Sequence, residues 1–214
     1  MFSAHSTADE ELLYVVGHDI TERRAREVQG RLLQDVTAQA NEADSVDEAL
    51  RIALRLFCRL TGWCFGKSWR LDADAGRLVP GVSCGPTAAE LRTFDEVCDG
   101  FAFEIGQGLP GQVWEGRAPK WIPDFGRDEN FLRARHALDA GLRTGFAAPV
   151  LADDELVAVI EFFARERHEE DARLLDIVSG VAAQVGTVIV RKETEEALRE
   201  TEPRFRSIAQ SATE

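Results

Sequence analysis

Long hydrophobic runs are missing from the sequence, and so is any cluster of basic residues. The longest apolar stretches, such as residues 156–164, are far shorter than the roughly 20 residues that span a bilayer, and the chain does not open with a basic segment followed by an apolar one. Nucleic acid and anionic lipid are bound by concentrated positive charge, whereas the formal net charge here is -13. We therefore expect a cytoplasmic protein that inserts into no membrane and binds no nucleic acid.

Cysteine is scarce and is not spaced for metal or disulfide chemistry. Cys58, Cys64, Cys84 and Cys98 form no C-x-x-C pair, and no histidine stands at zinc-finger spacing, so neither a metal cluster nor a thioredoxin-like motif is expected. Cys84 and Cys98 flank a predicted helix and are candidates for thiol catalysis. The acidic residues around them disfavour a reactive thiolate, so reduced core thiols are the favoured interpretation.

The features that are present predict one α+β domain between two helical extensions. A hydrophobic content of 44% over 214 residues fits one substantial core. Two capping boxes, residues 45–48 and 87–90, predict helices that end at Gly62 and near Gly100. Strands are predicted over residues 63–71, 77–84, 118–122, 145–150 and 156–164, and polar turns such as Asp153-Asp154 favour antiparallel pairing.

Residues 103–114 crowd three glycines and a proline into a predicted loop. Gly106, Gly108 and Gly111 match the G-x-G-x-x-G pattern of dinucleotide-binding loops. The nucleotide interpretation is disfavoured, because Pro110 would remove a backbone donor from the phosphate cradle and the neighbouring strands are antiparallel. Farther along, the polar connection over residues 123–143 is long enough to be a functional loop with a helix at 130–140, and we expect it to be a ligand lid.

Narrow apolar stripes mark the helices at both ends of the domain. The N-terminal stripe, in a helix over residues 22–41, contains Val28, Leu32 and Val36, and the C-terminal one, in a helix over 169–200, contains Val181, Val185 and Val188. Such stripes suit a single helical partner, so we expect a homodimer through these helices, with solvated faces as the alternative. Pro203 is expected to interrupt the second helix.

Several motifs in order resemble a GAF domain. They are the segment 103–114, Ile122-Pro123-Asp124, residues 140–144, Ala148-Pro149-Val150 and residues 155–163, where Ala158 stands in place of the usual glycine. The resemblance covers roughly residues 31–190 and implies an α+β fold: an antiparallel sheet of five to six strands flanked by helices, with long N- and C-terminal linker helices.

The flanks resemble parts of PAS domains. A short strand over residues 12–16 followed by residues 17–24 is similar to a PAS exit, and residues 198–208 are similar to a PAS entry. The implied order is the end of a PAS domain (1–20), a linker helix (21–44), a GAF domain (45–190), a second linker helix (191–203) and the start of another PAS domain (204–214). This implies a bacterial sensor of the histidine kinase or cyclic-dinucleotide type, with its output domain outside the chain.

Candidates for the lining of a ligand pocket are aromatic residues with a few polar groups. They are Trp69, Phe103, Trp114, Trp121, Asp124, His136, Phe146 and Glu161. For the tryptophans, including Trp63, core packing is favoured. Phe146 and Glu161 lie on strands expected to face the lid, but an outward, solvated Glu161 is favoured.

The cofactor is open at this stage. His136 could ligate haem, although a solvated helix surface is favoured. The resemblance implies that a covalent bilin would be attached through a cysteine in the connection over residues 123–143, and since this connection contains none, covalent bilin attachment is disfavoured. The leading hypothesis is a sensory module, not itself an enzyme, in which a small ligand shifts the packing of paired helices. The alternatives are a ligand-free dimerisation spacer and, less favoured, a thiol-dependent reductase.

Overall fold

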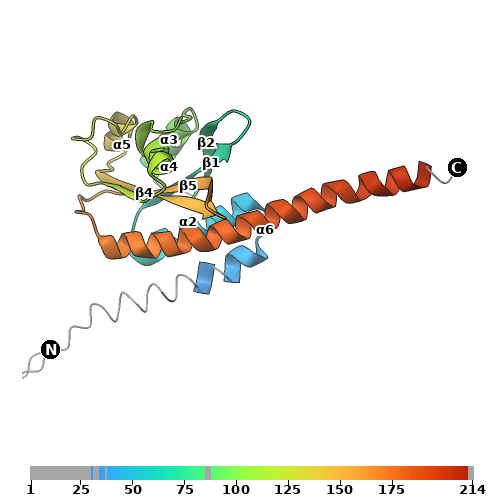
Figure 1. Ribbon diagram of the computed structural model, residues 1–214. Helices are drawn as coiled ribbons and strands as arrows, with labels where there is room; N and C mark the ends of the chain where they lie inside the picture. The colour runs from blue at the N-terminus through green and yellow to red at the C-terminus, as the bar shows by residue number, and fades with distance from the viewer. Residues whose placement is uncertain (1–29, 31–33, 37, 85–87, 212–214) are drawn as a thin grey trace, which may run out of the picture.

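A computed structural model of the chain describes residues 30, 34–36, 38–84 and 88–211 (Figure 1). A five-stranded antiparallel sheet has the order β2-β1-β5-β4-β3. Its strands are β1 (Phe65–Asp72), β2 (Arg77–Ser83), β3 (Lys120–Ile122), β4 (Thr144–Ala152) and β5 (Glu155–Ala164). The predicted α+β sheet of five to six strands is therefore confirmed, with five. The predicted strand at 12–16 and residues 1–29 lie outside the described residues.

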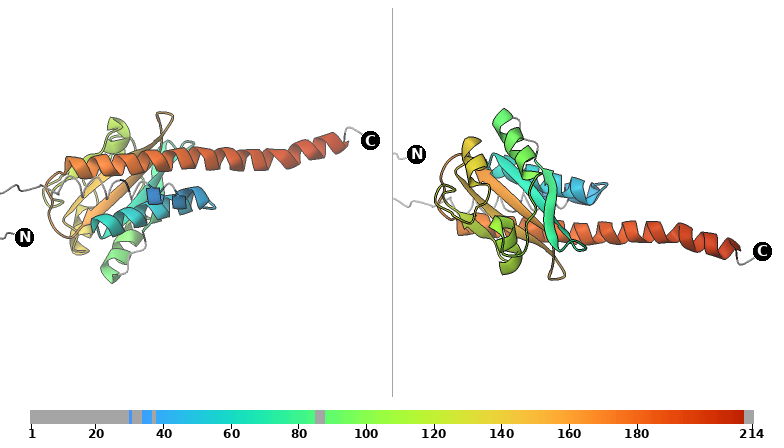
Figure 2. Two further views of the ribbon diagram at one scale, coloured as in Figure 1. Left: turned by 90° about the horizontal axis from the view of Figure 1, so that it is seen from below. Right: turned by 90° about the horizontal axis from the view of Figure 1, so that it is seen from above.

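The sheet separates two layers of helices (Figure 2). Helices α2 (Val46–Thr61) and α6 (Ala172–Ser211) cover one face, and α3 (Ala89–Cys98), α4 (Gly108–Gly116) and α5 (Ala134–Asp139) lie on the other. Since successive side chains of a strand point to opposite faces, each layer has its own core. In the central strand, Ile160 and Phe162 join the core under α2 and α6, and Val159 and Phe163 join the other.

The local signals at the start of the domain are confirmed. The Ser45 hydroxyl accepts a hydrogen bond from the backbone N–H of Glu48 at 3.2 Å, and Gly62 ends α2 in the left-handed conformation with φ of 81°. The hairpin turn between β4 and β5 is also found, with positive φ at Asp153 and Asp154. The N-cap of α3 is Ala88, which makes no side-chain cap bond, and the second predicted capping box depends on Thr87, which lies outside the described residues.

The glycine-rich segment was expected to be a loop, and this expectation is wrong, because it contains α4. Gly106 and Gly108 take positive φ at the helix start. Pro110 falls in the first turn, where its missing N–H would have no helical partner. Gly111 is required inside the helix, since a Cβ there would lie 2.1 Å from the carbonyl oxygen of Glu104. Gly106 and Gly108 therefore permit the left-handed backbone before the helix, and Gly111 permits close packing of backbone.

The C-terminal helix is longer than predicted. It begins at Ala172 and continues through Pro203 to Ser211, so the expected break at Pro203 is wrong. Proline removes one backbone donor, and the helix tolerates that loss in the part that projects beyond the domain (Figure 1). By length and composition alone, Ala172–Lys192 is apolar enough to cross a membrane. Its packing against the sheet explains this apolar character.

The residues proposed for a dimer seam lie inside the protomer where they are described. Val181, Val185 and Val188 are buried in the core between α6 and the sheet, and Val36 is buried in the same core. Val28 and Leu32 lie outside the described residues. Polar substitutions at the three buried valines of α6 would therefore disrupt the domain core and could not report on dimerisation.

Gly186 permits the closest approach of α6 to the sheet. A Cβ at this position would lie 2.0 Å from the carbonyl oxygen of Leu151. We predict that Gly186→Ala lowers the free energy of unfolding by about 1–3 kcal/mol, measured by urea denaturation, because backbone must shift to admit the methyl group. Gly116→Ala is the control, since no atom lies within 4 Å of the Cβ it would add. Equal effects of the two substitutions would contradict this account.

Candidate functional site

The connection between β3 and β4, residues 123–143, crosses the sheet face opposite α2 and α6 (Figure 1). A helix was expected over residues 130–140, but α5 begins only at Ala134. The Asp128 carboxylate accepts hydrogen bonds from the backbone N–H groups of Asn130 and Phe131, both at 2.9 Å, and this turn replaces the first part of the expected helix. Arg133 follows the turn as the N-cap residue of α5.

Arg133 and Glu161 form a buried ion pair between this connection and the central strand β5. The Nη2 atom of Arg133 lies 2.6 Å from Oε1 and 2.9 Å from Oε2 of Glu161, and the side chains are 1% and 0% exposed. The indole Nε1–H of Trp69, from β1, donates to Oε2 of Glu161 at 2.5 Å. The carboxylate thus accepts charge-assisted hydrogen bonds from two elements while excluded from water.

Five aromatic rings surround the guanidinium of Arg133. Its Cζ atom lies 4.9 Å from the ring centroid of Trp69, 5.2 Å from those of Phe103 and Phe131, and 5.9 Å from those of Phe94 and Phe163. We call these five residues with Glu161 the cation cage. Because ring faces carry negative potential, such a cage favours a cation beyond what the carboxylate alone provides.

The electrostatics of the cage keep Arg133 charged. Burial is the largest single influence and would lower the pKa of its guanidinium, but the charges of Glu161 and Cys98 and the hydrogen bonds to both side chains together raise that pKa. Arg133 also donates from Nη1 to the Sγ of Cys98 at 3.2 Å, and burial raises the pKa of the Cys98 thiol. The Nε–H of Arg133 has no hydrogen-bond partner. The arginine therefore occupies the cage without satisfying all of its donors.

The expectation that Glu161 points outward is wrong. It alternates with Ile160 and Phe162, which face α2 and α6, so it must face the lid side. The signal in the sequence was a single carboxylate within the apolar run of residues 156–164. Arg133 was not singled out, because an arginine in a polar connection looks like an exposed residue until its partner is known.

The other pocket candidates are distributed over both faces of the sheet. Trp69 and Phe103 belong to the cation cage, and Trp114 packs, partly buried, in the core on the same face. Phe146 and Trp121 stack at 5.1 Å in the core on the opposite face. Phe146 therefore does not face the lid, contrary to the expectation from its strand.

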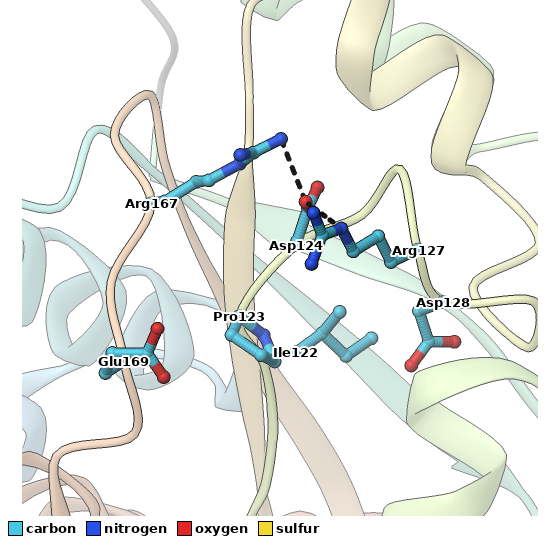
Figure 3. Close-up of a pocket in the computed structure, with 7 residues that line it drawn as sticks. All are labelled: Ile122, Pro123, Asp124, Arg127, Asp128, Arg167 and Glu169. Atoms are coloured by element: carbon cyan, nitrogen blue, oxygen red, sulfur yellow. Dashed lines mark ion pairs between the residues drawn. The ribbon is translucent and has the colours of Figure 1, made fainter.

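Asp124 and His136 lie in separate surface cavities. Asp124 lines a cavity of about 370 Å³ and pairs with Arg167 at 2.8 Å and Arg127 at 3.4 Å (Figure 3). His136 is exposed and lines a groove of about 250 Å³ between α3 and α5. We call this second cavity the access groove, because Phe94 belongs to both its lining and the cation cage.

The cysteines that lie together are not Cys84 and Cys98, the two candidates for thiol catalysis. Cys84 does not pair with Cys98 but lies with its Sγ 3.6 Å from the Sγ of Cys58, and it lines a cavity of about 570 Å³. The hydrogen bond between the two thiols lowers the pKa of Cys84 and raises that of Cys58, and the backbone N–H of Gly66 also donates to Cys84. Within the described residues, no group of three His, Cys, Asp or Glu side chains could hold a metal ion.

The hydrogen bond from Trp69 to the buried carboxylate should be measurable. We predict that Trp69→Phe lowers the free energy of unfolding by about 2 kcal/mol in chemical denaturation, because a buried charged acceptor loses a donor. Trp121→Phe is the matched control, since its Nε1–H donates at 3.0 Å to the neutral carbonyl of His168 in a partly buried setting. If Trp121→Phe lowers the free energy of unfolding by as much as Trp69→Phe, the hydrogen bond from the indole of Trp69 to Glu161 contributes no extra stability.

Solved structures share the fold of this chain. They include the GAF domain of a phosphoenolpyruvate-protein phosphotransferase (ptsP) from Coxiella burnetii, at 16% identity and a TM-score of 0.66, over 80% of this chain and 98% of that one. Free methionine-R-sulfoxide reductase from Neisseria meningitidis, in complex with its substrate, is similar at 15% identity and a TM-score of 0.63, over 86% and 98%. A putative GAF sensor protein from Burkholderia vietnamiensis is similar at 14% identity and a TM-score of 0.62, over 78% and 97%.

At these identities the likeness shows the fold alone. The family assignment rests on a sequence comparison, in which the family described as the GAF domain matches residues 43–190. That range contains the sheet, both layers of helices packed on it and the cation cage. The chain belongs to the GAF domain family.

Proposed function

We propose that this chain is a cytoplasmic regulatory module that senses a small molecule between the sheet and the lid formed by residues 123–143. The observation that carries the proposal is the buried ion pair of Arg133 and Glu161, since it ties the lid to the central strand through the centre of a potential ligand site. Two charges in an apolar interior cost much desolvation, so they are a weak way to achieve stability alone.

Coupling to the rest of the protein would run through the sheet. Glu161 stands in β5 between Ile160 and Phe162, which pack in the core with α2 and α6. α6 then leaves the domain and continues to Ser211 (Figure 1). A ligand that displaces Arg133 would change the support of β5 and bias the packing of α6, which is a shift between populations of two states.

The wider context follows from the flanking sequences. Residues 1–20 and 204–214 resemble parts of PAS domains, so the module would stand between two PAS units in a bacterial sensor of the histidine kinase or cyclic-dinucleotide type. Its terminal helices would pair in a homodimer. With Val36, Val181, Val185 and Val188 in the core, residues 191–211 of α6 are the segment that we propose for pairing.

Thermal-shift screening of the full chain tests the sensor proposal. A binder should raise the melting temperature, since a ligand at 100 times its Kd stabilises by about 2.7 kcal/mol, and should alter hydrogen exchange in both 123–143 and 172–211. The screen would contain cyclic nucleotides, haem, bilins, small acids and organic cations. The spacer alternative is favoured if no compound binds at millimolar concentration while Leu198→Asp, a substitution in the segment 191–211 of α6, abolishes the dimer in sedimentation.

A second candidate function is thiol chemistry at Cys58 and Cys84. It is favoured by their 3.6 Å separation, by the cavity beside Cys84 and by the likeness to free methionine-R-sulfoxide reductase. In such a reaction a sulfoxide and two thiols would give a thioether, a disulfide and water. Cys98 would take no part, because it is buried against Arg133.

Thiol reactivity separates this candidate from the sensor. If it is right, iodoacetamide should modify Cys84 in the native chain, and Cys84→Ser should abolish reduction of free methionine sulfoxide. Cys98→Ser is the matched control and should retain activity. Labelling of all four cysteines only after unfolding would exclude the reaction.

A further inference from the structure

The cation cage is a preformed site in which the charged group bonded to Arg133 is the carboxylate of Glu161. Lys67 stands opposite Glu161 in the pairing of β1 with β5, but its ammonium is already bonded to Asp95 and Asp99. Without Arg133 the cage would consist of five aromatic rings, the neutral Cys98 thiol and the carboxylate of Glu161. A buried carboxylate is costly without a partner charge, so the emptied cage favours a cation. Anions and neutral molecules would not supply that partner charge.

We propose that the cage binds a small organic cation of the alkylguanidinium class, and that Arg133 is a tethered occupant which this ligand displaces. The inference rests on the proposed sensor function and adds the chemistry of the ligand. A planar guanidinium can lie against several ring faces at once and donate to both oxygens of Glu161. Arg133 shows this geometry in the cage.

The fit of Arg133 itself is incomplete. A well-formed arginine–carboxylate pair uses two nitrogens in a fork, whereas here Nη2 alone donates to both oxygens and Nε has no partner. A free alkylguanidinium is not bound to the backbone of the lid and can rotate to make both bonds. The tethered side chain is therefore replaceable by a ligand of its own chemistry.

The surroundings also favour the approach of a cation. The access groove between α3 and α5 carries the carboxylates of Glu90 and Asp139, and Phe94 stands between this groove and the cage. α5 is a six-residue helix that follows directly on Arg133, so a small displacement of this segment would withdraw the guanidinium. Acidic groups at the mouth of a cavity raise the local concentration of cations.

The experiment replaces the side chain by a free molecule. Arg133→Ala in the full chain removes the atoms of N-ethylguanidinium, and calorimetric titration with that cation should show binding. N-ethylurea has nearly the same shape without the charge and should bind at least about tenfold more weakly. The double variant Arg133→Ala/Glu161→Gln should lose the preference for the cation.

The wild-type chain provides the competition arm. Arg133 is present at a high effective concentration, so ethylguanidinium should bind about tenfold or more weakly than to Arg133→Ala, and bound cation should increase hydrogen exchange in residues 123–143. Arg135→Ala removes an exposed arginine of the same segment and should leave the wild-type affinity unchanged.

Each outcome decides the proposal. Absence of binding to Arg133→Ala, or equal binding of ethylurea, overturns it. If Arg133→Ala is unfolded alone, recovery of its circular dichroism by ethylguanidinium and not by ethylurea supports the proposal, and no recovery by either counts against it. A different class of ligand that binds the wild-type chain and alters α6 would leave the sensor function standing and defeat only the cation assignment.

Discussion

The buried pair of Arg133 and Glu161 constrains the face of the domain on which the lid lies. Glu161 is in the central strand, and its fully enclosed carboxylate is stabilised by the cation beside it. The cation comes from the connection between β3 and β4, which fixes the start of α5 over the sheet. The five rings exclude water from the pair and strengthen its attraction. The same ion pair thus positions the lid over the sheet and balances the charge in the core.

The sheet connects this ion pair to the core on its opposite face, under α2 and α6. Its central strand alternates between the two cores, so β5 cannot shift toward the lid without changing the support of Phe162, which packs against Phe57 of α2 at 4.1 Å between ring centroids. α6 is held as closely, because its backbone at Gly186 meets the carbonyl of Leu151. Close packing of this kind moves as discrete arrangements, which suits a switch.

Local sequence signals predicted most helices and strands, whereas the candidate site depends on residues that lie far apart in the sequence. The Ser45 cap, the Gly62 stop and the Asp153-Asp154 turn depend on a few neighbouring residues, so the sequence shows them directly. The segment before Trp114 was wrongly predicted to be a loop, because the sequence does not show that Gly111 packs against the backbone carbonyl of Glu104. Arg133 and Glu161 are 28 positions apart, and neither indicates the other without the fold. At Pro203 the local signal itself was misleading, because proline predicted a break and α6 continues through it.

Comparison with Lys67, another buried cation, shows why Arg133 is replaceable and Lys67 is structural. It lies on the same face of the sheet and is 2% exposed, and its Nζ contacts Asp95 at 2.7 Å and Asp99 at 2.6 Å. Burial disfavours its charge, but the bonds to both carboxylates outweigh this and raise the pKa of Lys67. Its partners lie at the end of α3, so the lysine ties that helix to β1. Arg133 has one carboxylate, an unpaired Nε and aromatic walls that would accept another cation equally well. Of the two cations that are buried in the described part of the chain, Arg133 is therefore the one whose place a ligand could take.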